Sequence, residues 1–322
     1  MTYQTIISRF ASKKIAVFGD VILDKFVYGK VERISPEAPV PVVQVEEEKY
    51  MPGGAANVAA NIKSLGGYPY LFGITGEDYY RDILLQACGK LGIDTGGVLA
   101  DKKKMTTLKT RIIGLNQQLL RIDHEDTAYI ESHQEKDFLR ILADLQVDAI
   151  VVSDYAKGSI TSELLTELKA YVTRQKIKII IDPKPKHRDW YRGVTLITPN
   201  QKEAGIMSGI TIEKVADFLQ AGRYLQEKLQ TEIILTAGSR GIYVFPLGEE
   251  PVAIPTRARE VYDVSGAGDT VAAAITLASC SGASLVEAAD IANHAAGIKV
   301  GKLGTVPVFV DELIYELNDK KS

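Results

Sequence analysis

The chain has 322 residues, of which 46% are hydrophobic and 25% are charged, and its formal net charge is −3. This composition is typical of a folded globular protein and excludes a disordered or fibrous chain. The slightly acidic balance argues against a nucleic-acid partner bound through a basic surface. Neither a membrane span nor a signal peptide is predicted, because the chain has no apolar run of about 18 residues and no apolar core near its start.

The two cysteines are too few for a disulfide framework. Cys88 and Cys280 both lie in apolar stretches with a helical pattern, so we expect them to be buried free thiols. Reduced thiols in a chain without a signal peptide favour a cytoplasmic location.

The first part of the chain mixes buried strands, helices and proline-rich segments. A buried strand is predicted at 14–20, where an apolar run ends in Gly19-Asp20. The stretch 26–45 contains three prolines, which cannot donate to a sheet ladder, so it favours edge strands or a flap. Strands at 106–113 and 117–122 form a predicted hairpin around Asn116. Between these segments we expect helices at 55–65 and 79–91, a strand at 70–73 and a turn-rich segment after the second helix.

From residue 131 onward, predicted helices and strands alternate. This alternation favours a mostly parallel sheet that is covered by helices on both faces. We expect helices at 131–146, 160–175, 213–230, 268–280, 284–300 and 310–319, strands at 149–153, 177–181, 194–197 and 232–235, and a hairpin-like stretch at 241–254.

Two β-rich insertions, at about 25–48 and 104–123, do not fit that sheet, and we interpret them as one separate β lid. A rule of ~150 residues per domain gives about two domains for this length. The pattern instead predicts one α/β domain over residues 1–322 with a discontinuous lid.

The segment 263–270 reads Asp-Val-Ser-Gly-Ala-Gly-Asp-Thr and opens an alanine-rich helix. Gly266, Ala267 and Gly268 leave backbone N–H groups at the helix start, where the helix dipole favours an anion such as a phosphoryl group in transfer. Asp269 lies in the same turn, so its carboxylate suits a base that takes a proton from an attacking hydroxyl. The alternative is that Asp269 is a plain helix cap.

Three shorter motifs also lie at predicted helix starts or strand ends. Gly53 and Gly54 precede a helix and let a ligand approach the backbone, and Asn57 offers donors and an acceptor for sugar hydroxyls. The alternative is a capped helix with a structural asparagine. Asn200 and Glu203 are three residues apart, so they face one way on a helical turn and suit a hydrated Mg²⁺.

The last motif, at 236–241, follows a strand at the sheet edge where open α/β sheets bind ligands, although an ordinary tight turn explains it equally well.

The order and spacing of these motifs resemble the ribokinase-like (pfkB) family of carbohydrate kinases. Gly53-Gly54-x-x-Asn57 is followed at the expected intervals by Gly66 and Gly76. The segment 263–269 is similar to the second family signature, with Val-Ser where many members have two threonines. The resemblance covers nearly the whole chain.

The resemblance implies a three-layer α/β fold with a small β lid, and an enzyme that uses ATP and Mg²⁺ to phosphorylate a sugar hydroxyl. Asp269 is then the catalytic base, and the amides of residues 266–268 form the anion hole. The other implied contacts are Asn200 and Glu203 for phosphate and Mg²⁺, Thr236, Gly238 and Gly241 for the ATP phosphates and ribose, Asn293 for the adenine region, Asp24, Gly54 and Asn57 for sugar hydroxyls, and Asp263 and Ser265 for a monovalent cation such as K⁺.

Further stretches narrow the sugar. Residues 33–42, 116–123 and 153–158 look like kinases of D-glycero-D-manno-heptose 7-phosphate, which make heptose 1,7-bisphosphate for the bacterial lipopolysaccharide core. Residues 182–184 and 301–305 add to this likeness, although Pro185 stands where that group has glycine.

A sugar that carries a phosphate needs cations, and Arg grips phosphate through paired hydrogen bonds. Lys109 and Arg111 share one face of a lid strand, so we predict that they bind the sugar phosphate unless they are merely exposed lid charges. Asp154 and Lys157 are further predicted substrate residues, and Arg121 and Lys184 are additional candidate cations.

Several alternatives remain at this point. The sugar could instead be fructose 1- or 6-phosphate, ribose or a nucleoside, and the chain could be a non-catalytic sugar- or nucleotide-binding relative. A dinucleotide-dependent oxidoreductase is disfavoured, because the turn after the first strand lacks GxGxxG. By analogy with the family we expect a homodimer formed through the lid. Because the chain stops at Ser322, we also expect any later adenylyl transfer to need another polypeptide.

Overall fold

The computed structural model of this chain describes residues 1–115, 117–258, 260–302 and 306–319. Within them, a nine-stranded sheet forms the centre, in the order β13-β12-β11-β10-β9-β8-β1-β4-β5. Its pairings are parallel from β11 to β5, while β12 pairs antiparallel with both β11 and β13. The strands are β1 (Lys14–Gly19), β4 (Tyr68–Gly76), β5 (Asp94–Asp101), β8 (Ala149–Ser153), β9 (Lys178–Asp182), β10 (Leu196–Ile197), β11 (Glu232–Thr236), β12 (Ile242–Phe245) and β13 (Val252–Ile254).

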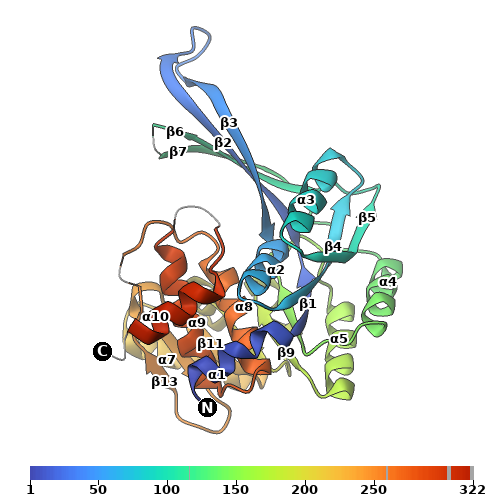
Figure 1. The fold of residues 1–322 in the computed structure, drawn as a ribbon, viewed down its shortest axis with the longest axis vertical. Helices are drawn as coiled ribbons and strands as arrows, with labels where there is room; N and C mark the ends of the chain where they lie inside the picture. The colour runs from blue at the N-terminus through green and yellow to red at the C-terminus, as the bar shows by residue number, and fades with distance from the viewer. Residues whose placement is uncertain (116, 259, 303–305, 320–322) are drawn as a thin grey trace.

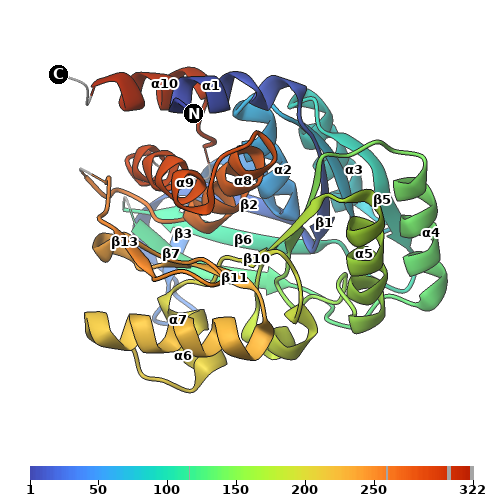
Figure 2. The ribbon, with the colours of Figure 1, turned by 90° about the horizontal axis from the view of Figure 1, so that it is seen from below.

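Helices cover both faces of this sheet (Figure 2). Successive strand residues point to opposite faces, so Val17 and Val151 enter one core while Phe18 and Val152 enter the other. The first core is closed by α1 (Tyr3–Ser8), α2 (Ala55–Ser64), α3 (Tyr79–Lys90), α8 (Ala267–Cys280), α9 (Leu285–Val300) and α10 (Val310–Asp319). The second core is closed by α4 (Ser132–Ala143), α5 (Ser162–Gln175), α6 (Gln201–Ser208) and α7 (Val215–Leu229).

A smaller sheet forms a lid, in the strand order β3-β2-β6-β7. Its strands are β2 (Val21–Ile34), β3 (Pro41–Gly54), β6 (Thr107–Gly114) and β7 (Gln117–His124). Strands β2 and β6 are distant in sequence and pair in parallel. Each begins an antiparallel hairpin, β2 with β3 and β6 with β7. The long β2–β3 hairpin projects well beyond the body (Figure 1).

Asp20 joins the two sheets, because it is the only residue between β1 and β2. Its carboxylate accepts hydrogen bonds from the backbone N–H groups of Tyr155, Lys157 and Ser159, at 2.8, 3.0 and 2.9 Å. Its carbonyl accepts the N–H of Ala55, the first residue of α2, at 3.0 Å. Asp20 therefore fixes the lid, α2 and the loop after β8 relative to one another.

The structure confirms the predicted α/β class and the lid built from two separate segments. Most predicted helices and strands are present within a few residues of their expected bounds. Two helices, α1 and α6, were not predicted, and the segment expected to be turn-rich contains the edge strand β5. The sequence of β5 is poor in strand formers, and its Gly97 is required because a Cβ there would lie 2.5 Å from the Phe72 ring.

The expectations for the cysteines, for membrane spans and for two short stretches can also be compared with the structure. Cys88 is buried in α3 and Cys280 is half-buried in α8, and both are free thiols. Among the helices of the described residues, none is long and apolar enough to cross a membrane. The predicted turn residue Asn116 and residues 303–305 of one sugar-type stretch lie outside the described residues.

Candidate active site

Asp269 lies in the first turn of α8 with only 4% of its surface exposed. The Asn57 side-chain amide donates to its Oδ2 at 2.6 Å, and the Tyr155 hydroxyl donates to its Oδ1 at 3.1 Å. The N-cap of α8 is Gly266, in the left-handed conformation with φ of 74°. Asp269 is therefore not the helix cap, and its carboxylate is instead held from two other elements.

The environment of Asp269 makes it a weaker acid than a solvent-exposed aspartate. Burial raises the pKa of its carboxyl to about 6, and the nearby Asp24 carboxylate acts in the same direction. The hydrogen bonds from Asn57 and Tyr155, and the Lys184 ammonium, oppose this rise. A carboxylate with a pKa just below neutral is well matched to accept a proton from a hydroxyl at physiological pH.

The turn that starts α8 carries the backbone amides of the predicted anion hole. A Cβ on Gly268 would meet no atom within 4 Å, so open space lies over this residue. The N–H of Ala267 donates to the Val264 carbonyl at 3.2 Å, so of the three predicted anion-hole amides this one is engaged in the turn itself. The predicted anion hole therefore relies most on Gly266 and Gly268.

Asp24 lies on β2 and is 5% exposed. Its Oδ1 accepts a hydrogen bond from Arg111 Nη1 at 2.5 Å. Gly53 makes room for this side chain, since a Cβ there would lie 2.4 Å from Asp24 Oδ2. Gly54 has φ of 56° and would clash with the Asp20 carbonyl if it carried a side chain, which explains the glycine pair before α2.

The candidate phosphate-binding cations differ in their pairing. Arg111 is bonded to Asp24, Lys157 to Glu125 at 2.6 Å and Arg121 to Asp123 at 3.0 Å. Lys109 stands opposite Asp24 of β2 and Asp123 of β7 in strand register, and its ammonium lies 5.6 Å from the centre of the Tyr155 ring. In the described parts of the chain, Lys109 forms no ion pair with a carboxylate. Burial lowers the pKa of Lys109, against the opposing effect of Asp123 and Asp24.

The prediction that Asp154 contacts the substrate needs correction. Its side chain is fully buried, and its two oxygens accept hydrogen bonds from His187 Nδ1 at 2.6 Å, the Tyr191 hydroxyl at 2.7 Å and the Ala156 N–H at 2.7 Å. This carboxylate has no exposed surface and already accepts three hydrogen bonds, so the structure does not present it to a sugar. Asp154 instead shapes the loop that carries Tyr155 and Lys157.

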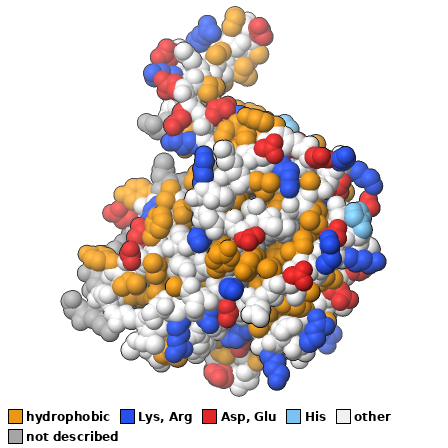
Figure 3. All heavy atoms as spheres, turned by 45° about the vertical axis from the view of Figure 1, so that its right-hand side comes forward, with side chains coloured by type: hydrophobic (Ala, Val, Ile, Leu, Met, Phe, Trp, Pro, Cys, Tyr) orange, Lys and Arg blue, Asp and Glu red, His pale blue; other side chains and the backbone are white. Residues whose placement is uncertain are grey.

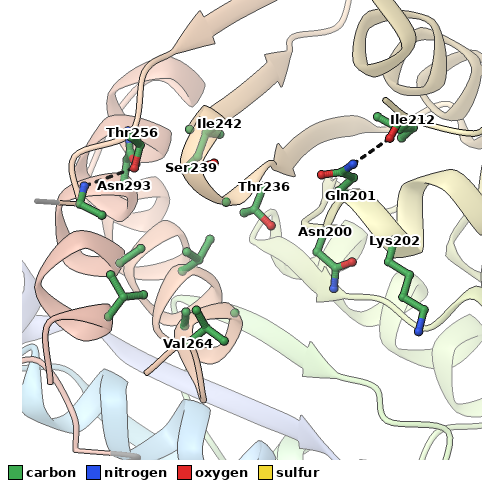
Figure 4. Close-up of a pocket in the computed structure, with 18 of the residues that line it drawn as sticks. Asn200, Gln201, Lys202, Ile212, Thr236, Ser239, Ile242, Thr256, Val264 and Asn293 are labelled. Atoms are coloured by element: carbon green, nitrogen blue, oxygen red, sulfur yellow. Dashed lines mark hydrogen bonds between the residues drawn. The ribbon is translucent and has the colours of Figure 1, made fainter. Parts of the chain in front are cut away.

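A cavity of about 1060 Å³ lies beside the α8 turn, large enough for a nucleotide. In Figure 4, Asn293 and Thr256 lie on one side of it, the start of α6 lies on the other, and Thr236 lies between them. The predicted nucleotide residues line this cavity, namely Asn200, Thr236, Gly238, Gly241 and Asn293, together with Gly268 of the predicted anion hole.

The individual lining residues also have structural roles. Asn200 and Thr236 form a bridge between the ends of β10 and β11. Gly241, with φ of 88°, is needed because a Cβ there would lie 2.0 Å from the Ile254 carbonyl. Asn293 donates one N–H of its side-chain amide to the Pro255 carbonyl at 2.7 Å, which orients the amide for the predicted adenine contact.

The residues predicted to bind Mg²⁺ form the start of α6. Asn200 is the N-cap, and a capping box joins it to Glu203. Glu203 Oε1 also accepts a bond from Lys184 Nζ at 2.6 Å. The carboxyl of Asp182 lies close by, and burial together with the charges of Glu203 and Asp269 raises its pKa well above the usual value. Because both oxygens of Glu203 already accept hydrogen bonds, from Lys184 and from the Asn200 N–H, Glu203 would act on Mg²⁺ through water, as is common for this ion.

No cluster of three or more histidine, cysteine, aspartate or glutamate side chains with metal-binding geometry occurs in residues 1–115, 117–258, 260–302 and 306–319. Such a set is not needed for Mg²⁺ that is shared with substrate phosphates. At the predicted monovalent-cation site, Asp263 Oδ1 accepts the Ser265 N–H at 2.8 Å. Lys299 is buried nearby, and burial lowers its pKa while Asp263 and Asp269 oppose this effect.

Three residues of the site were assigned no individual role from the sequence, although Tyr155 and Asp182 lie in stretches that carry the likeness to heptose kinases. Tyr155 contacts the proposed base, Asp20 holds the Tyr155 loop, and Asp182 lies beside Glu203. Asp20 directly follows β1, Asp182 ends β9, and Tyr155 is the second residue after β8. The rule that ligands bind at the carboxyl ends of such strands could have singled them out.

Comparison with known proteins agrees with this geometry. The model of the family described as "pfkB family carbohydrate kinase" matches residues 12–311. The chain belongs to the pfkB family of carbohydrate kinases. Enzymes of this kind transfer a phosphoryl group to a sugar hydroxyl, with ATP and a divalent metal ion, and this kinase has the cavity and the buried carboxylate that such a reaction needs.

Curated relatives of this kinase are longer proteins. It is 41% identical over 317 residues to the bifunctional protein HldE of Desulfatibacillum aliphaticivorans, covering 98% of this chain and 65% of the relative. It is 42% identical over 305 residues to the protein of that name from Geobacter sulfurreducens, covering 94% and 62%. The chain thus spans a little under two thirds of the length of these relatives.

Solved structures support the fold of this kinase. Arabidopsis thaliana ribokinase complexed with ribose and ATP matches with a TM-score of 0.75 and 20% identity, over 95% of this chain and 98% of that one. Phosphofructokinase-2 from Escherichia coli in complex with potassium matches with a TM-score of 0.81 and 18% identity, over 96% and 99%.

We predict that Asp269 of the ligand-free enzyme titrates at about pH 6, because burial destabilises its charged form. The measurement is a pH titration of ¹³C-labelled aspartate carboxyl signals by NMR. The signal of Asp269 is the one missing from the Asp269→Asn variant. A base must be ionised to act, so turnover should fall as the pH drops through this value. A signal that titrates near the ordinary aspartate pKa of about 4 would contradict this prediction.

Proposed function

We propose that this kinase transfers the γ-phosphoryl group of ATP to O1 of D-glycero-D-manno-heptose 7-phosphate and so makes heptose 1,7-bisphosphate. The observation that carries the proposal is Lys109, a half-buried ammonium on the lid next to Tyr155 that has no carboxylate partner in the described parts of the chain. An ammonium without a carboxylate partner is available to bind an anionic group on the sugar.

The neighbouring charges support the same choice. Arg111 is committed to Asp24, and Lys157 to Glu125, so neither is as available for a phosphate as Lys109. The sequence likeness of three stretches to heptose 7-phosphate kinases and the identity to proteins named HldE favour heptose as the sugar. Fructose 1- or 6-phosphate would meet the same charge requirement and is the strongest competitor.

In the proposed reaction, Asp24 and Asn57 orient the sugar hydroxyls, and Asp269 takes the proton of the anomeric hydroxyl. The oxygen then attacks the γ-phosphorus in line, and ADP leaves. The amides at the start of α8 and the positive end of the helix face the transferred group. Magnesium, held from Asn200 and Glu203, would neutralise charge on the nucleotide phosphates. The lid excludes water, which would otherwise accept the phosphoryl group.

A bound K⁺ at Asp263 and Ser265 stays a prediction. Lys299 already supplies one positive charge near Asp263, so the enzyme's need for a further cation there is best judged by activity with and without K⁺. A cytoplasmic location is likewise part of the proposal.

We further propose that the enzyme is a homodimer joined through its lids. Apolar side chains are exposed on the lid sheet beside charged ones, and Figure 3 shows both kinds on the projecting hairpin. Strands β3 and β7 are the edges of this sheet, and exposed edges favour pairing with another chain. The exposed apolar residues are Ile34, Val40, Val45, Leu120 and Ile122.

The substrate proposal is tested with purified enzyme, ATP, Mg²⁺ and a panel of heptose 7-phosphate, fructose 1-phosphate, fructose 6-phosphate, ribose and adenosine. Products are identified by mass and ³¹P NMR. We expect the highest kcat/KM with heptose 7-phosphate and a new anomeric phosphate signal. Faster turnover of an unphosphorylated sugar would refute the proposal.

The same panel is run with Lys109→Met and, as a control, Lys30→Met, which removes an exposed lid lysine. Loss of a charge-assisted hydrogen bond should raise the KM for the phosphorylated sugar roughly 10- to 100-fold in Lys109→Met. The KM for ATP and the kinetics of Lys30→Met should stay near wild type. An unchanged sugar KM in Lys109→Met would remove Lys109 from the proposed site.

The dimer is tested by sedimentation velocity. We expect wild type to sediment as a dimer and the double variant Ile34→Asp, Val45→Asp as a monomer, because buried aspartates would destabilise the lid contact. Tyr79→Asp, at an exposed position on α3, is the control and should remain dimeric. A monomeric wild type, or equal disruption by Tyr79→Asp, would rule out the lid interface.

A further inference from the structure

Tyr155 occupies a central position among the charged groups of the site. Its hydroxyl donates to Asp269 Oδ1 at 3.1 Å. The ammonium of Lys109, from lid strand β6, lies 5.6 Å from the centre of its ring, and that of Lys184, from the loop after β9, lies 5.0 Å from it. Tyr155 thus bonds to Asp269, the proposed base, and its ring lies next to Lys109 of the lid and to Lys184, which pairs with Glu203.

We propose that Tyr155 is a positioning residue for the base: its hydroxyl holds Asp269 in the ionised, correctly oriented state, and its ring keeps Lys109 and Lys184 on either flank of the reaction. The proposal rests on the proposed role of Asp269 as base. It assigns a function to a tyrosine that need not touch either substrate.

The backbone around Tyr155 is rigid enough for this role. The Tyr155 N–H is bonded to Asp20 at 2.8 Å, and the next residue, Ala156, has φ of 55° and donates its N–H to Asp154 at 2.7 Å. A left-handed alanine costs of order 1 kcal/mol and persists only where surrounding contacts enforce it. Two buried aspartates therefore aim the tyrosine at Asp269.

The hydroxyl acts on Asp269 by stabilising its charged form. A hydrogen bond donated to a carboxylate favours ionisation and so lowers its pKa. Without the Tyr155 hydroxyl, burial would raise the pKa of Asp269 further, and a larger part of the enzyme would hold a protonated, inactive base. The acid limb of the pH–rate profile would then lie at higher pH.

Other groups also face Asp269, and their side chains are unchanged when this hydroxyl is removed. They are Asn57 from α2, Asp24 from β2, Asp182 and Lys184 at the end of β9, and Lys299 from α9. Lys109 faces the tyrosine ring and not the carboxylate. A Tyr155→Phe substitution keeps the aromatic ring and removes only the hydroxyl. A change in its pH profile therefore reports the loss of the hydroxyl.

The test compares pH profiles of kcat for wild type and Tyr155→Phe, with whichever sugar the enzyme phosphorylates best. We expect the acid limb of Tyr155→Phe to move to higher pH by about half to one unit, the equivalent of one hydrogen bond. The phosphates of the substrates titrate identically in assays of both proteins, so they do not contribute to the difference between the two pH profiles. Incorporation of 3-fluorotyrosine at position 155, a stronger donor, should move the limb to lower pH.

Tyr129→Phe is the matched control. It removes a hydroxyl that bonds His187 Nε2 at 2.8 Å, and His187 in turn holds Asp154 of the same loop at 2.6 Å. Its acid limb should coincide with that of wild type. An unmoved limb in Tyr155→Phe, or an equal shift in Tyr129→Phe, would overturn the inference.

If Tyr155→Phe does not fold, the fluorotyrosine protein decides, and a limb that fails to move to lower pH overturns the inference. Turnover by Asp269→Asn would instead refute the base itself. The two failures are therefore distinguishable.

Discussion

The active site depends on a single buried carboxylate that is not part of the chemistry. Asp20 stands where the chain leaves the central sheet for the lid, and its oxygens accept three backbone N–H groups of the loop after β8. A buried charge is tolerated only when such donors satisfy it, so the loop cannot move away from the start of the lid without leaving the charge unpaired. The backbone carbonyl of Asp20 holds α2 at the same point, through the Ala55 N–H. Because α2 carries Asn57 and the loop carries Tyr155, Asp20 indirectly positions both donors to Asp269.

Charge balance explains how a slightly acidic chain can handle two anionic substrates. Most cations around the site are already paired with carboxylates: Arg111 with Asp24, Lys157 with Glu125 and Lys184 with Glu203. The binding of phosphates therefore relies on backbone amides, a helix start, a divalent cation and Lys109, and needs no extended basic surface. Burial raises the pKa of the Asp269 carboxyl to about 6, and of the paired carboxylates Asp24 acts in the same direction.

The sequence was sufficient to predict the fold class, the lid and the glycine turn at the start of α8, because glycines at helix starts and alternating apolar runs have direct local causes. It could not reveal contacts made across the fold. Asp154 was assigned to the substrate, yet His187 and Tyr191, more than 30 residues away, occupy its carboxylate. Strand β5 was missed because only its packing on Phe72 explains its glycines. Tyr155 was overlooked because its partner Asp269 lies 114 residues later in the chain.

The central claim is that Asp269 removes the proton from the sugar hydroxyl, and the most direct measurement compares Asp269→Asn with wild type in both turnover and ATP binding. Asparagine keeps the size and the hydrogen-bonding character of the side chain but cannot accept the proton at neutral pH. The account predicts that kcat falls by at least about 10²-fold, while calorimetry gives a Kd for ATP close to that of wild type. Near-normal turnover of the sugar by Asp269→Asn would contradict it.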